Sequence, residues 1–251
     1  MNALERALIE KAGRENGWEN FIESDEATVV LSSARHPAQV FVAPADSGIG
    51  WDVAIPAGLI RQELIRSLPI PYQENGAIQI TDMDQLASLL RRTAELAQSL
   101  PTQAARTYEA RVKDSLERTL PDSTEVERLV RQRIGQDTFR EALMDYWDGA
   151  CAVTGIQLPQ VLRASHAKPW AECESDEERL DVFNGFLLSA NLDALFDRGL
   201  ITFNGIGGMV CSPKLTPNCL SALHLSEGHS LRWIAPEHGP YLAWHRSKVF
   251  Q

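Results

Sequence analysis

Residues 164–198 read ASHAKPWAECESDEERLDVFNGFLLSANLDALFDR, and this stretch decides the fold of the C-terminal part of the chain. Residues 161–166 form a short, largely apolar run that ends before Pro169, which predicts a strand with His166 at its end. A polar connection rich in Asp and Glu follows over residues 172–178 and predicts a solvated loop.

A second strand and a helix follow this connection. Asn184 and Gly185 form a turn signal directly before the apolar residues 186–188, which predicts the second strand. From residue 190 to residue 198 the apolar side chains recur at helical spacing, and Gly199 is a typical C-terminal cap. The predicted unit is therefore strand, loop, strand, helix.

The polar residues of this unit have the properties of a hydrolytic site. An unperturbed imidazole has a pKa near ~6.5, so much of His166 is unprotonated at neutral pH and able to act as a general base. Asp193 and Asp197 lie about one helical turn apart, so both carboxylates project from one face of the predicted helix. Such hard oxygen ligands favour Mg²⁺ or Mn²⁺, and a base beside a bound divalent cation is what phosphodiester hydrolysis needs. Asn184 carries no charge, and we expect it to hydrogen-bond the segment that bears His166 and to hold the imidazole in place.

Each of these residues also has an ordinary structural interpretation. A single His after a strand is usually a polar residue at a strand end, and Asp193 with Asp197 is also compatible with a solvated helix face. The order of the residues and the motifs around them favour the catalytic interpretation. We also expect that removing the His166 ring leaves the fold intact, because we predict no core contact for it.

Several runs of residues resemble the His-Asn-His (HNH) endonuclease family, in the branch common among bacterial restriction-type nucleases. They are SHAKPW at 165–170, FNGFLL at 183–188 and LDALFDRGLITF at 192–203, with Gly135-Gln136 and Phe139-Arg140, CAVTG at 151–155, and YLAWHR at 241–246. The resemblance covers about residues 131–250 and implies a ββα-metal fold.

The resemblance also implies roles for individual residues. In the family the first His activates water, the Asn orients it and the third position binds metal, which gives His166, Asn184 and Asp193. The chain departs from the family at two positions, because the third is Asp193 rather than His and the residue before the base, often a metal ligand, is Ser165. Ser165 is therefore a weak candidate ligand beside Asp193 and Asp197.

The charge of the chain argues against a protein that coats nucleic acid. The formal net charge is −10, and residues 1–100 carry 8 basic and 14 acidic side chains, whereas residues 151–251 carry 8 and 10. DNA contact is therefore expected to be local and to involve Arg163, Lys168 and Arg198. We expect His245 to pack or to contact phosphate rather than to catalyse.

The cysteines and the apolar runs exclude some classes of protein. The four cysteines contain no C-x-x-C pair, so we expect reduced, mostly buried thiols and no zinc knuckle. No apolar run approaches the ~20 residues of a membrane span, and the N-terminus lacks the apolar core of a signal peptide. A cytoplasmic protein is expected.

We expect an α+β fold in which a small N-terminal domain and connector helices precede the ββα-metal nuclease domain. The predicted boundaries are 1–101 for the first domain, 102–134 for a helical connector interrupted at Pro121 and Asp122, and 135–251 for the nuclease domain. In the first domain we predict helices over 2–15, over 57–67 and from Thr81, and strands over 28–31, 39–42, 51–55 and 77–80. It contains no catalytic set, and recognition or regulation is its expected role.

Three functions remain open at this point. The first is a metal-dependent DNA endonuclease in restriction or phage defence, acting alone, as a homodimer or with a protein partner. The second is a catalytically weakened HNH-fold module that binds nucleic acid, which the Asp193 and Ser165 departures allow. The third is a nuclease gated by a ligand or protein on the N-terminal domain.

Overall fold

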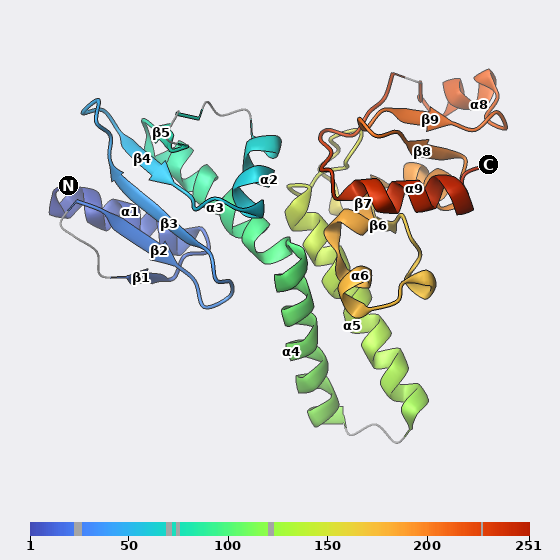
Figure 1. Cartoon of the computed structure of the whole chain (residues 1–251), viewed down its shortest axis with the longest axis horizontal. Coiled ribbons are helices and arrows are strands. Elements are labelled where there is room, and N and C mark those ends of the chain that lie inside the picture. The colour runs from blue at the N-terminus through green and yellow to red at the C-terminus, as the bar shows by residue number, and fades with distance from the viewer. Residues whose placement is uncertain (23–26, 69–71, 74–75, 120–122, 227) are drawn as a thin grey trace. The chain divides into compact units, whose positions relative to one another are not determined.

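A computed structural model of the chain describes residues 1–22, 27–68, 72–73, 76–119, 123–226 and 228–251. Helices and strands are mixed along the chain, which confirms the predicted α+β class (Figure 1). Contacts between residues divide it into two units, Met1–Gln98 and Ser99–Gln251. No helix among the described residues has the length and apolar character needed to cross a membrane.

Unit 1 contains an antiparallel sheet in which neighbours along the chain are neighbours in space. Its strands are β1 (Asn20–Ile22), β2 (Val29–Ser32), β3 (Gln39–Pro44), β4 (Trp51–Ala54) and β5 (Ile78–Ile80), in the order β1-β2-β3-β4-β5. The four strands expected from alternating apolar residues are confirmed as β2 to β5. β1 was not predicted, because its three residues are too few to show a period.

Three helices complete unit 1: α1 (Ala3–Glu15), α2 (Leu59–Ser67) and α3 (Met83–Ser99). α1 begins with a capping box formed by Asn2 and Glu5, and it packs on β2, where Gly13 lies against Leu31. Trp18 is fully buried, and its indole Nε1 donates to the Leu90 carbonyl of α3 over 2.9 Å. This buried bond fixes the end of α1 to α3.

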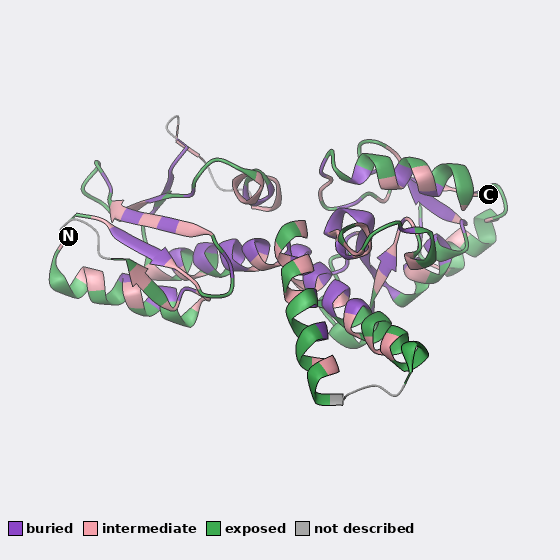
Figure 2. Cartoon of the chain, turned by 60° about the horizontal axis from the view of Figure 1, so that its bottom comes forward, coloured by how far each residue is buried: buried purple, intermediate pink, exposed green. Residues whose placement is uncertain are grey.

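Unit 2 begins with two long helices, α4 (Pro101–Thr119) and α5 (Thr124–Tyr146), which pack on each other. The break predicted at Pro121 and Asp122 lies outside the described residues. α5 runs through Gly135 without interruption, so the helix crosses the domain boundary expected at 134/135. Its N-terminal half is mostly exposed, whereas its C-terminal half has one buried face (Figure 2).

The C-terminal half of α5 supplies the base on which the rest of unit 2 packs. In the sequence, the spacing of Phe139, Leu143, Tyr146 and Trp147 predicts an apolar stripe that packs on the ββα unit. All four side chains are almost fully buried, which confirms the stripe. Tyr146 meets the ring of Phe183 edge to face at 5.6 Å between centroids. The stripe therefore joins α5 to the segment just before the second strand of the ββα unit.

The predicted strand, strand and helix are confirmed as β6 (Leu162–His166), β7 (Gly185–Ser189) and α7 (Ala190–Asp197). The predicted solvated loop between the strands is wrong in part, because this connection contains the 3-10 turns η2 (Trp170–Glu172) and η3 (Val182–Asn184) and the short helix α6 (Asp176–Leu180). Ser175 caps α6 by accepting from the Glu178 amide.

The chain continues around this unit with shorter elements. A 3-10 turn, η1 (Pro159–Val161), precedes β6. The apolar runs on either side of the glycine-rich residues 204–208 predict a hairpin, and it is confirmed as β8 (Ile201–Phe203) and β9 (Met209–Cys211) after α7. Two helices, α8 (Pro217–Ala222) and α9 (His238–Lys248), close the unit. All four cysteines are free thiols; Cys151 and Cys173 are buried, whereas Cys219 is exposed, contrary to the expectation of mostly buried thiols.

Candidate active site

β6 and β7 pair antiparallel, and their register sets the position of His166. His166 pairs with Gly185 at the end of the two-stranded sheet, and Leu162 pairs with Ser189 at the other end. A Cβ atom at Gly185 would lie 2.6 Å from Cζ of Phe139, so only glycine lets the buried Phe139 ring approach the strand this closely. Gly185 thus creates the space in which Phe139 meets His166.

The His166 ring is held by contacts on several sides. Its face stacks on Phe139, with ring centroids 3.7 Å apart and an angle of 16° between the planes. The Trp170 ring meets it edge-on at 6.1 Å between centroids. Its Nε2 lies 2.9 Å from the carbonyl oxygen of Arg179. The expectation that His166 makes no core contact is therefore wrong.

The bond to Arg179 determines which ring nitrogen is available. A carbonyl oxygen only accepts hydrogen bonds, so Nε2 of His166 carries the hydrogen and Nδ1 keeps its lone pair in the neutral ring. Burial lowers the pKa of His166 to about 4, and the bond to the Arg179 carbonyl opposes this shift. The imidazole is therefore neutral at pH 7, with Nδ1 able to accept a proton.

Asn184 is fully buried, and its side chain hydrogen-bonds two separate parts of the connection between β6 and β7. Its Oδ1 accepts from the Lys168 amide over 2.8 Å, and its Nδ2 donates to the carbonyls of Lys168 at 3.2 Å and Glu178 at 3.1 Å. Its own carbonyl accepts from the amide of Ala167, the residue after His166, over 2.9 Å. These contacts support the expected positioning role, which acts through the backbone beside His166 rather than on the ring.

The structure brings Asp193, Asp197 and Ser165 together between α7 and β6. Ser165 Oγ donates to Asp197 Oδ1 over 3.2 Å. Burial raises the pKa of Asp193, and burial followed by the negative charge of Asp193 raises the pKa of Asp197. The described residues include no cluster of three or more His, Cys, Asp and Glu side chains, so these carboxylates form a pair rather than a larger ligand set.

A cavity of about 370 Å³ is shared by the histidine and one carboxylate of the pair, since its lining includes His166, Trp170 and Asp197. A cation fits beside these carboxylates, because a positive charge there would offset the desolvation of both and the repulsion that Asp193 exerts on Asp197. Mg²⁺ is commonly held by one or two carboxylates and keeps several waters, so the pair fits this kind of ion.

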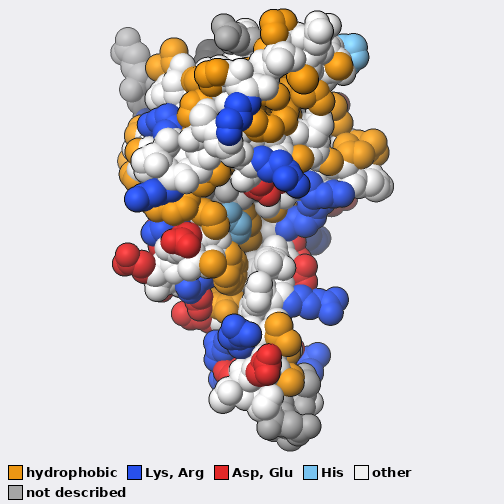
Figure 3. Space-filling view, turned by 90° about the vertical axis from the view of Figure 1, so that its right-hand side faces the viewer, with side chains coloured by type: hydrophobic (Ala, Val, Ile, Leu, Met, Phe, Trp, Pro, Cys, Tyr) orange, Lys and Arg blue, Asp and Glu red, His pale blue; other side chains and the backbone are white. Residues whose placement is uncertain are grey.

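The basic residues predicted to contact nucleic acid have different surroundings. Arg163 and Arg198 are exposed, and their positive charges act on Asp193 and Asp197, respectively. Lys168 is instead engaged in an ion pair, with Nζ 2.7 Å from Oε1 of Glu178. The face of unit 2 in Figure 3 shows Lys and Arg side chains around a hollow in which a histidine is visible.

Residues 151–204 match the family model described as HNH endonuclease. The matched segment begins at Cys151, ends in the turn after β8, and contains the whole ββα unit with His166, Asn184 and Asp193. The predicted HNH family is confirmed over this segment, and the match indicates a nuclease that acts on nucleic acid. No curated protein matches the chain.

Sequence reasoning did not find every residue around the HNH histidine. Phe139 was assigned only to the core and Arg179 to no role, although both touch the imidazole. The sequence offers one local indication of the stacked Phe139 ring: Gly185, which pairs with His166 across the two strands, has no side chain to exclude it. His245 is buried as expected, with Nδ1 3.0 Å from Thr202 Oγ1 and Nε2 3.0 Å from the Phe196 carbonyl, so it packs against α7.

Proposed function

We propose that this protein is a metal-dependent DNA endonuclease in which His166 is the general base. The observation that carries the proposal is the cavity that His166 and Asp197 line together, with Nδ1 of a neutral imidazole left without the hydrogen. A base and an acidic metal ligand that line one cavity are the two parts that phosphodiester hydrolysis needs.

In this proposal His166 Nδ1 takes the proton from the attacking water while Nε2 stays bonded to the Arg179 carbonyl. The bond fixes the tautomer, so proton transfer needs no rearrangement of the ring. Asn184 holds the backbone on both sides of the connection and keeps the imidazole at one place in the cavity. Asp193 and Asp197 are the proposed ligands of a divalent cation, with Ser165 as a weak third oxygen.

That cation would supply stabilisation of the charge that develops on the phosphate and on the leaving oxygen. The ligand chemistry favours Mg²⁺ or Mn²⁺, because replacing the family's third His by Asp193 leaves oxygen donors only. Arg163 and Arg198 are the proposed phosphate contacts beside these carboxylates. Lys168 contributes to DNA contact only after its ion pair with Glu178 opens.

A role in restriction or phage defence follows from the resemblance to the restriction-type branch, with unit 1 recognising a target or receiving a signal from a ligand or protein. Phage challenge of cells that produce the protein tests this role. Protection by the wild type that is lost in His166→Gln supports it, and equal plaque counts on both strains contradict it.

The activity itself is tested by incubating supercoiled plasmid with purified protein and Mg²⁺ or Mn²⁺. The wild type is expected to nick the plasmid, and His166→Gln to leave it intact at the same protein concentration. Arg246→Gln is a control in the same unit, because Arg246 donates to the Phe203 carbonyl away from the proposed ligands.

The second candidate, a binding module with weakened catalysis, is favoured by the small ligand set of two carboxylates. It predicts DNA binding by the wild type that needs neither metal nor His166, with no nicking under any metal. Gel-shift measurements beside the plasmid assay separate the two functions.

A further inference from the structure

The short helix α6 ends with carbonyl groups that bond to both predicted catalytic side chains. The last carbonyls of any helix lack partners within the helix. In α6 the Glu178 carbonyl accepts from Asn184 Nδ2 over 3.1 Å, and the Arg179 carbonyl lies 2.9 Å from His166 Nε2. The orientation of α6 therefore sets the hydrogen bonds of His166 and Asn184.

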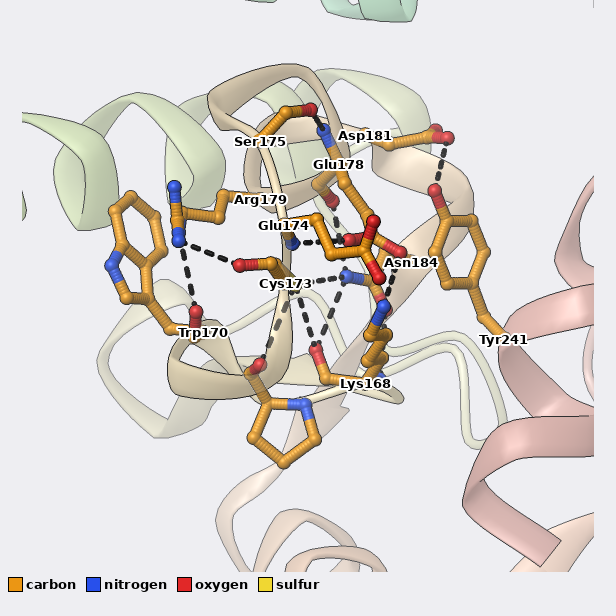
Figure 4. A network of polar contacts seen from close by, with 11 residues as sticks. Lys168, Trp170, Cys173, Glu174, Ser175, Glu178, Arg179, Asp181, Asn184 and Tyr241 are labelled. Carbon is orange, nitrogen blue, oxygen red and sulfur yellow. Dashed lines mark hydrogen bonds and ion pairs between the residues drawn. The ribbon is translucent and has the colours of Figure 1, made fainter. Parts of the chain in front are cut away.

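The side chain of Arg179 joins α6 to the segment before it, in addition to the contacts of Glu178 with Lys168 and with the Glu174 amide. The Nε of Arg179 donates to the Trp170 carbonyl over 3.2 Å, and one terminal nitrogen donates to the Cys173 carbonyl over 2.6 Å (Figure 4). The other terminal nitrogen lies 2.9 Å from Asp176 Oδ1. The guanidinium also lies over the Trp170 ring, 5.6 Å from its centroid. One side chain thus joins both ends of the turn between His166 and α6.

The geometry of these contacts requires arginine. Three acceptors lie around one planar group, and only a guanidinium donates in several fixed directions at once. Lysine has a single nitrogen on a flexible chain and does not reproduce this arrangement. The connection carries no strand that would otherwise hold residues 170–176 against α6.

We propose that Arg179 is a positioning residue, whose guanidinium holds α6 so that the Arg179 carbonyl selects the Nε2–H tautomer of His166 and leaves Nδ1 facing the reaction. The proposal deepens the proposed nuclease function and rests on it for its catalytic consequence. The tautomer itself is a property of the folded protein and is measurable without substrate or metal.

Arg140 offers a matched control. Its guanidinium also bonds two backbone carbonyls, those of Leu162 at 2.8 Å and Pro159 at 2.9 Å, but at the opposite end of β6 from His166. Loss of either arginine side chain removes bonds to backbone carbonyls near the same strand. Only loss of the Arg179 side chain is expected to change the imidazole.

The test is a ¹H–¹⁵N correlation spectrum of the histidine side chains in ¹⁵N-labelled full-length protein at pH 7, with the His166 signals assigned by His166→Gln. The wild type is expected to show the neutral Nε2–H pattern for His166. Arg179→Ala and Arg179→Lys are expected to move these signals toward an average of the two tautomers, whereas Arg140→Ala keeps the wild-type pattern. Arg179→Lys decides the result if Arg179→Ala does not fold.

Plasmid nicking by the same variants provides the second readout. We expect kcat to fall about 10- to 100-fold in Arg179→Lys while KM changes much less, because the loss affects orientation of the base and not DNA binding. A folded Arg179→Lys with an unchanged His166 pattern overturns the positioning role. If the wild type does not cut DNA but the His166 pattern responds to Arg179 and not to Arg140, the nuclease proposal fails and the positioning role stands.

Discussion

The packing contacts of His166 and its proposed chemical role reside in different parts of the ring. Its face packs on Phe139 and its Nε2 is bonded to the Arg179 carbonyl. Deleting the whole side chain therefore removes buried contact area together with the base. A substitution that separates the two effects has to preserve part of the volume.

We predict that His166→Gln and His166→Ala both lose about 10²- to 10⁴-fold in the rate of nicking, the usual contribution of a general base. His166→Ala is expected to unfold at a lower urea concentration than His166→Gln, since it leaves a space against Phe139. The measurements are plasmid time courses and urea titrations followed by circular dichroism. Cutting by His166→Gln at the wild-type rate would mean that another group is the base.

The carboxylate pair gives a second prediction at the residue scale. Asp193→Asn is expected to abolish Mn²⁺ binding in isothermal titration, and Asp197→Asn to weaken it less, because Asp197 is proposed as the supporting ligand. Without metal, each variant is expected to melt at a temperature equal to or above that of the wild type, since burial raises the pKa of both carboxyls and makes their charged forms unfavourable. Mn²⁺ is expected to raise the wild-type melting temperature most. Equal Mn²⁺ affinity in all three proteins would place the ligands elsewhere.

Among the elements, α5 supports the candidate site because one of its faces supplies Phe139 and contacts Trp170, the two aromatic rings beside His166. Gly135 lies under the Trp170 ring, and Phe139, one turn later, stacks on His166. A Cβ atom at Gly135 would collide with Cη2 of Trp170. Glycine lowers the intrinsic stability of the helix at this position, but it allows the Trp170 ring to pack closely on α5.

Gly135→Ala is expected to destabilise the protein by about 1–3 kcal/mol despite the better helix propensity of alanine, because the ring of Trp170 has to move. Gln136→Ala, at the next and exposed position of α5, is the control and is expected to change stability little. Urea unfolding midpoints compare the two. A Gly135→Ala protein more stable than the wild type would show that Trp170 does not pack on α5 in solution.

The turn η3 is capped by a partly buried carboxyl whose ionisation affects stability. Asp181 caps η3 by accepting from the Phe183 amide over 2.8 Å, and Tyr241 of α9 donates to its other oxygen over 2.9 Å. Burial raises its pKa from 3.8 to about 6, and the carboxylates of Glu237 and Glu178 add to the shift. Because the pKa is higher in the folded state, the stability that Asp181 contributes is complete below about pH 3.8 and is lost as the pH rises through about 6.

We therefore predict that Asp181→Asn gains stability relative to the wild type between pH 4 and pH 7, by at most about 3 kcal/mol for a shift of about two pKa units. The asparagine keeps an oxygen for Tyr241 and Phe183 but does not ionise. Unfolding free energies of both proteins across this pH range provide the measurement. Parallel pH profiles would contradict the raised pKa.

At the scale of the whole molecule, the number of candidate sites determines how many DNA strands one chain can cut. The described residues contain one candidate His-Asn-Asp site. A single base with a single cation site is suited to cutting one strand in each encounter with DNA, so a double-strand break needs a second site. Soluble homo-oligomers are most often two-fold dimers, which would present two sites to antiparallel strands. Unit 1 carries most of the negative charge, which opposes pairing through that surface.

Nicked circles are therefore expected to accumulate before linear DNA when supercoiled plasmid is digested. Mass measurement in solution at the same protein concentration shows whether a dimer is present. A strict monomer that yields linear product without a nicked intermediate would contradict the one-site, one-strand argument.

The sequence by itself determined the element types of the ββα unit and the HNH family of residues 151–204, because both depend on local periods and short motifs. It also indicated that α5 packs its aromatic stripe inward, since that stripe repeats at helical spacing. Element types, short motifs and the stripe of α5 all depend on residues that are close together in the sequence, so they can be predicted without any long-range contact.

Only the tertiary structure decided how the candidate site is arranged. The Nε2–H tautomer of His166 depends on a carbonyl from α6, and the ring stacked on His166 comes from α5. Lys168 is paired with Glu178 within the connection between β6 and β7, which the acidic composition of that connection predicted to be a solvated loop. Such contacts join residues that are distant in the sequence, and their geometry depends on the path of the backbone between them. Residue types and spacings specify which groups are present, whereas packing specifies which atoms meet.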